Sequence, residues 1–87
     1  MMTREILSEL YGDDLLFMDG PEFDEAIAGI AERADGNHVV AYDTLRVLDI
    51  LEKDMTPDEA REYFDFNISC AWVGPKTPVY LVTSFSL

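Results

Sequence analysis

The chain has 87 residues, which is enough for one domain spanning residues 1–87 and too few for two. Its apolar fraction of 48% is ordinary for a globular protein and excludes an intrinsically disordered chain. Eighteen acids against six bases give a net charge of −12, which excludes nucleic acid and anionic membranes as direct partners.

The first half of the sequence predicts two helices separated by a short strand. Residues 3–11 have apolar side chains at helical spacing, with Thr3 as the N-cap. Residues 15–18 form a short apolar run between turn residues, which favours a strand. The spacing of apolar residues then predicts a helix over 21–34 that ends at the Asp-Gly-Asn of residues 35–37.

The second half predicts a strand, two helices and a final strand. Residues 38–42 have strand composition, and Asp43 is placed to cap a helix over 44–53. A longer helix follows over 56–70, and residues 79–85 have the composition of a last strand. The predicted fold class is therefore α+β, with about four helices packed on a small sheet of two to three strands. We expect its first strand–helix–strand unit to be parallel and right-handed.

The helix over 56–70 carries the clearest local signal in the chain. Thr56, Pro57 and Glu59 form the pattern of a capping box at its start. Helical spacing places the following residues on its inner face: Ala60, Tyr63, Phe64, Asn67, Ile68 and Ala71. Phe66 and Trp72 fall off that face, and we favour a second core contact for them over an exposed interface.

Few residues are suited to catalysis or metal binding. His38 and Cys70 are the only histidine and the only cysteine, and such a lone pair is more typical of structural roles than of a nucleophile with its base. Asp13, Asp14 and Asp19 are more typical of a solvated turn than of a divalent-ion site. We therefore predict no enzyme activity, no catalytic residues, no cofactor and no metal.

Cysteine usage and the first residues indicate the compartment. A single cysteine excludes an internal disulfide and fits a reducing environment. The chain begins with a segment that contains Glu5 and Glu9, which is unlike a secretory signal. We expect a cytoplasmic protein, without a membrane span.

Five short patterns between Leu15 and Val82 resemble those of small uncharacterised acidic proteins of bacteriophages and prophages. They comprise Asp19-Gly20 before Phe23 to Ile27, Val39 to Asp43, Met55 to Ala60, Tyr63 to Asn67, and Ala71 to Gly74 with Thr77-Pro78. The resemblance implies a phage or mobile-element origin and a host-cell cytoplasm. It implies no activity.

By analogy with small acidic phage proteins, we expect a nucleic-acid mimic that binds and inhibits a host defence protein. The expected partner has a basic nucleic-acid-binding groove, as in an anti-CRISPR or anti-restriction protein. The candidate contact surface consists of acids on two predicted helices: Glu22, Asp24, Glu25, Asp58, Glu59, Glu62 and Asp65. Acidity that serves only solubility or a salty cytoplasm is the competing interpretation.

Two other classes of function remain open at this stage. The last strand, with Tyr80, Val82 and Phe85, could pair with a second copy in a homodimer or a structural phage assembly. A small-molecule-binding module would instead require a true cavity.

Overall fold

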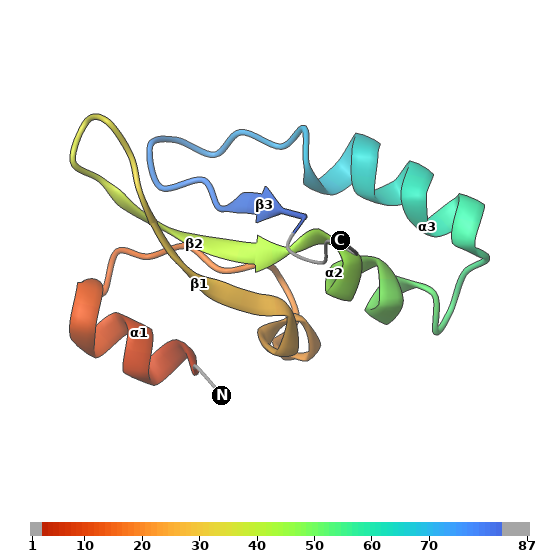
Figure 1. Ribbon diagram of the computed structural model, residues 1–87, viewed down its shortest axis with the longest axis horizontal. Helices are drawn as coiled ribbons and strands as arrows, with labels where there is room; N and C mark the ends of the chain where they lie inside the picture. Colours follow the sequence, from red (N-terminus) through yellow and green to blue (C-terminus); the bar gives the residue numbers. More distant parts are fainter. Residues whose placement is uncertain (1–2, 83–87) are drawn as a thin grey trace, which may run out of the picture.

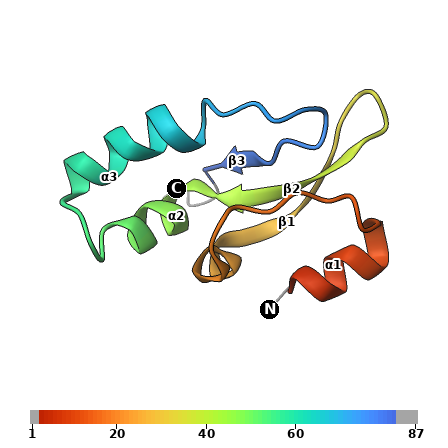
Figure 2. The same cartoon turned by 180° about the vertical axis from the view of Figure 1, so that it is seen from behind.

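The computed structural model describes residues 3–82 and confirms the α+β class, with helices around a three-stranded sheet. The elements in chain order are α1 (Arg4–Tyr11), the 3₁₀ helix η1 (Pro21–Ala26), β1 (Ile27–Glu32), β2 (His38–Asp43), α2 (Thr44–Leu51), α3 (Pro57–Tyr63), the π-helical turn η2 (Phe64–Ile68) and β3 (Val79–Leu81). α1 and α3 lie at opposite ends of the molecule (Figures 1 and 2).

The helix predicted over 21–34 is wrong after residue 26, where β1 begins and pairs antiparallel with β2. A tight turn joins the two strands: Gly36 N–H donates to Arg33 O at 2.9 Å, and Arg33 N–H donates to Asn37 O at 2.8 Å. Gly36 has a φ of +88°, which glycine adopts without steric cost. The Asp-Gly-Asn sequence is therefore a hairpin turn here rather than a helix stop.

β2 is the central strand, and its two neighbours run in opposite directions. Its parallel partner is β3, with Ala41 opposite Val79, and five of its six residues are buried. The parallel unit predicted between residues 15–18 and 38–42 is therefore wrong. The crossover that produces the parallel pair instead runs through α2 and α3.

The apolar run over residues 15–18 is not a strand. It crosses a face of the sheet on the way from α1 to η1 (Figure 2). Leu15 and Met18 are buried, and Met18 N–H donates to the hydroxyl oxygen of Tyr42 at 2.9 Å. The run is apolar because it packs on the sheet, and its backbone joins no ladder.

The helix starts predicted from capping residues are confirmed. Leu45 N–H donates to Asp43 Oδ1 at 3.0 Å, which caps α2. At α3, Glu59 N–H donates to Thr56 Oγ1 at 3.2 Å, and Thr56 N–H donates to Glu59 Oε1 at 3.0 Å. Hydrogen bonds from the Thr56 amide and hydroxyl stabilise the ionised Glu59 carboxylate and so lower the pKa of Glu59.

Replacing Thr56 with alanine is expected to reduce the free energy of unfolding by about 1 kcal/mol, because an N-cap acceptor is lost. Urea denaturation at neutral pH measures the difference from the unchanged protein. Since the pKa of Glu59 is lowered in the fold, its contribution is present above its unfolded pKa and is lost as the pH falls. Equal stabilities at neutral pH would contradict a capping role.

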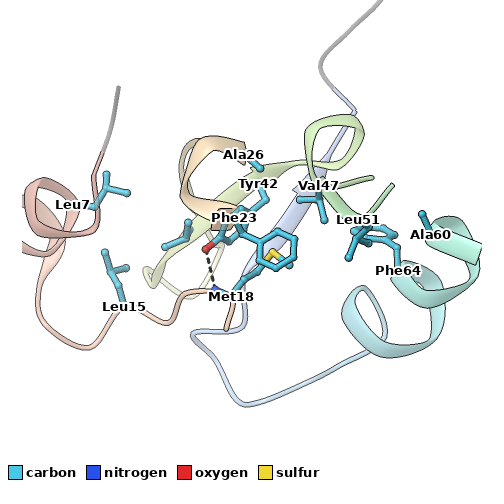
Figure 3. Close-up of a cluster of buried hydrophobic side chains, with 11 residues drawn as sticks. Leu7, Leu15, Met18, Phe23, Ala26, Tyr42, Val47, Leu51, Ala60 and Phe64 are labelled. Atoms are coloured by element: carbon cyan, nitrogen blue, oxygen red, sulfur yellow. Dashed lines mark hydrogen bonds between the residues drawn. The ribbon is translucent and has the colours of Figure 1, made fainter. Parts of the chain in front are cut away.

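The hydrophobic core runs through the molecule as one row of side chains. Figure 3 shows it from Leu7 and Leu15 at one end, through Tyr42, to Phe64 and Ala60 at the other. Tyr80 of β3 joins the row, with its ring stacked on Tyr42 at a centroid distance of 5.9 Å and edge-to-face with Phe64 at 5.3 Å. Aromatic pairs therefore connect the sheet to η2.

Candidate interaction surfaces

The structure distributes the predicted acidic contact residues over three elements. Glu22, Asp24 and Glu25 lie on η1, whereas Asp58, Glu59, Glu62 and Asp65 lie on α3 and η2. α2 packs against both η1 and α3. The seven acids therefore form two groups that flank α2.

Three of the seven carboxylates have partners within the fold. Asp24 forms an ion pair of 2.7 Å with Arg4, and Asp65 forms one of 3.2 Å with Arg61. Glu59 completes the capping box of α3. The other four are less constrained, because within residues 3–82 no ion pair engages Glu22, Glu25, Asp58 or Glu62.

Sequence reasoning missed three acids that lie between these two groups. Asp49 is on α2, and Glu52 and Asp54 follow in the turn before α3; all three are exposed. For Asp49 and Glu52 the signal was present in the sequence, because both fall off the apolar side of the helix predicted over 44–53, and Asp54 directly follows that helix. The surface is mixed at one place, where Glu25 and Asp49 share a shallow hollow with Arg46 and Lys53.

The acidic charge of the chain is largely unneutralised by internal contacts. Every aspartate and glutamate lies between residues 5 and 65, and all are in the described part of the structure. Five of the 18 form ion pairs there within 4.0 Å, one of them with His38. Most carboxylates therefore face solvent and add to the negative potential around the molecule.

The core position predicted for Phe66 and Trp72 is wrong. Phe66 is 73% exposed and Trp72 is 63% exposed. Phe66 lies on the side of η2 away from the core, and the Trp72 ring contacts the Arg33 guanidinium at the surface, 5.3 Å from its centroid. A second packing layer on that side of η2 does not form within residues 3–82.

The inner face predicted for residues 56–70 is correct at Ala60 and Phe64, which are buried, and at Ile68, which is half-buried. Tyr63, Asn67 and Ala71 are exposed instead. Asn67 lies within the π-helical turn, where Ser69 N–H donates to Phe64 O at 2.8 Å, and Ala71 lies after this turn has ended. A five-residue step rotates the following side chains around the helix axis, and such turns are frequent at functional sites.

An open groove of about 780 Å³ lies between the segment that crosses the sheet and the helical side of the molecule. Buried Met18, Phe23 and Leu51 contribute to its lining, and exposed Leu16 and Val73 lie at its surface. A second hollow of about 410 Å³ adjoins it, because both are lined by the same three residues: Met55, Tyr63 and Asn67.

Within the described residues, the strand predicted for self-association covers Val79–Leu81, and residues 83–85 of the prediction lie outside them. Tyr80 is half-buried and packs against the core cluster, and this burial raises its pKa to about 12. Val82 is exposed immediately after β3, and Phe85 lies outside the described residues. Among the strands of residues 3–82, β3 lies at the edge of the sheet, and its outer side is a position where another strand can add.

The two residues considered for nucleophilic catalysis contact different parts of the chain. The His38 ring lies 5.3 Å from that of Tyr11 and 3.8 Å from the Glu32 carboxylate. The Cys70 thiol donates to Asp65 O at 2.6 Å. Within residues 3–82, no three or more histidine, cysteine or acidic side chains are grouped as metal ligands.

No protein-family model, no curated protein and no solved structure matches this chain. Among the described helices, none is both long enough and apolar enough to span a bilayer. The interaction surfaces therefore rest on their own geometry and charge.

Proposed function

We propose that this chain is a non-enzymatic, acidic phage-type protein that binds a host protein with a basic nucleic-acid-binding groove and inhibits it. The observation that carries the proposal is the exposed acidic face around α2. Four carboxylates without ion pairs in the described structure flank this helix: Glu22, Glu25, Asp58 and Glu62.

The charge balance supports binding to a partner with a basic surface. Exposed carboxylates that lack internal cations retain the ability to form charge-assisted bonds with lysine and arginine of a partner. Their combined field also speeds the encounter with a basic surface. The exposed rings of Tyr63 and Phe66, next to Glu62, add the aromatic contact area that is typical of binding hot spots.

The test uses purified restriction and CRISPR nucleases of a bacterial host, with DNA cleavage and direct binding as the two measurements. Binding should weaken by about tenfold or more between low and high salt, because the contact is electrostatic. Cleavage should fall as the chain displaces DNA. Affinity that is equal at low and high salt, or no effect on any nuclease tested, would contradict the proposal.

Two variants that each remove three negative charges distinguish the effect of the acidic face on binding from the effect of net charge. The triple variant Glu25→Gln, Asp58→Asn, Glu62→Gln should bind about tenfold more weakly, because three partner contacts are lost. The control variant Glu5→Gln, Glu9→Gln, Asp13→Asn changes exposed acids on and after α1. If both variants lose affinity equally, the face around α2 has no special role.

Self-association is the second candidate, favoured by the exposed apolar residues at the end of β3. Leu81 and Val82 are both exposed next to the open strand edge. Sedimentation equilibrium should then show a dimer that Val82→Lys converts to a monomer. A strict monomer at high concentration excludes this function.

A further inference from the structure

We infer that the apolar groove binds a short amphipathic segment of a partner protein, with large apolar side chains facing the groove and lysine or arginine on its flanks. The inference rests on the proposed function only in taking the partner to be a basic protein. It adds the place where that partner inserts and the chemistry of the inserted segment.

The lining of the groove selects apolar side chains. Aliphatic, aromatic and methionine residues from the crossing segment, η1, α2, α3, η2 and β3 meet there, and they include Phe17, Ile68 and Tyr80. Leu16, Tyr63 and Val73 are exposed at its surface, so an occupant would remove their apolar atoms from water. Several large side chains can therefore be accommodated in its volume of about 780 Å³.

The charged residues of the groove are all acidic. Asp19 and Glu22 are the charged side chains of its lining, and Glu59 and Glu62 are those of the adjoining hollow. Arg4 reaches the segment of residues 17–20, but its guanidinium is engaged by Asp24 and by the carbonyl oxygens of Met18 and Gly20. An apolar floor with an acidic rim is complementary to an amphipathic basic segment.

The other hollows and occupants fit less well. A hollow near Trp72 is lined by Arg33, and the one at α2 is lined by Arg46 and Lys53, so neither has the acid-only charged lining of this groove and its neighbour. A second copy of the chain carries the same charge of −12 and would be repelled from an acidic rim. A small molecule favours an enclosed pocket, whereas this groove is open.

The probe for the test is a synthetic leucine–lysine peptide of about 14 residues, patterned so that the leucines form one helical stripe. A second peptide replaces each lysine with glutamate and keeps the stripe, and a third has the first composition in scrambled order. NMR amide shifts of the labelled protein map the contact, and fluorescence anisotropy of labelled peptide measures affinity. The lysine peptide should shift the amides of Leu16, Asn67 and Val73 most strongly.

Variants at exposed positions test the groove without disturbing the core. The double variant Leu16→Ser with Val73→Ser should bind the lysine peptide about tenfold more weakly, because apolar contacts are lost. The control Ile6→Ser with Leu10→Ser removes two exposed apolar residues of α1 that do not line the groove. Thermal unfolding verifies that both variants are folded.

The outcomes distinguish binding in the groove from binding by the acidic face alone. If the lysine peptide binds but the groove variant matches the control variant, the groove inference is overturned, while a purely electrostatic contact still stands. Equal binding of the lysine, glutamate and scrambled peptides also overturns it, as does a protein dimer that the groove variant dissociates. Groove-dependent binding of the lysine peptide supports the inference even if no nuclease is inhibited.

Discussion

Replacing Phe64 with alanine is expected to lower the free energy of unfolding by about 3–5 kcal/mol, as for other large core aromatics. Phe64 is 3% exposed, belongs to the main core cluster and packs edge-to-face on Tyr80. A domain of this size has a total stability of about 4–13 kcal/mol, so the loss is a large fraction of the total and should lower the urea midpoint clearly. Urea denaturation followed by circular dichroism measures the change.

Phe66→Ala provides a control with the same chemical change two residues along the chain. Because Phe66 is 73% exposed, its loss should alter the free energy of unfolding by less than about 0.5 kcal/mol. A loss as large as that of Phe64→Ala would show that Phe66 packs in a core, as the sequence had predicted. The pair therefore tests the orientation of the π-helical turn.

Local signals predicted the parts of the fold that local contacts determine. Thr3, Asp43 and Thr56 each accept a backbone hydrogen bond from a residue two or three positions ahead, and all three were recognised as caps. The helices that follow them begin where the sequence indicated. Such hydrogen bonds depend on a few neighbouring residues, so they can be predicted from the sequence alone.

The main error of fold prediction is at β1, where apolar spacing fits both a helix and a strand. Ile27, Ile30 and Ala31 recur at helical spacing, but β-branched isoleucine and the glycine at position 29 weaken a helix. Pairing with β2 decides between the two structures, and that contact involves residues that are distant in the chain. The same limit applies to residues 15–18, which pack on the sheet through Tyr42.

The sequence predicts the negative charge of the interaction surfaces, but it does not predict their ion pairs or the groove. Acid-rich exposed positions on the helices follow from composition and periodicity alone. The ion pair of Asp24 with Arg4 joins residues 20 positions apart, so its structural role was hidden in the sequence. The groove is likewise lined by residues from several separate segments, so no short sequence motif predicts it.

Raising the pH above 10 is expected to destabilise the fold through half-buried Tyr80 and buried Tyr42. Burial raises the pKa of Tyr80 from 10.0 to about 12, and burial is also the main cause of the raised pKa of Tyr42. An unfolded chain releases these protons near pH 10, whereas the fold retains them. Stability contributed by the neutral hydroxyl is therefore complete below about pH 10 and is lost as the pH rises through about 12.

The size of the effect is tested by comparing the protein with its Tyr80→Phe variant. Near pH 11, ionisation of the unfolded chain should cost the unchanged protein about 1.4 kcal/mol through Tyr80, a loss that phenylalanine cannot undergo. The variant retains every lysine and arginine, so general alkaline effects cancel in the difference. Urea denaturation at roughly pH 8 and pH 11 measures the free energy of unfolding of both proteins. Between these pH values, the unchanged protein should lose more of this free energy than the variant. If the difference between the two proteins is the same at both pH values, the Tyr80 hydroxyl ionises equally in the folded and unfolded chain, and the burial of its ring against Tyr42 and Phe64 has no electrostatic consequence.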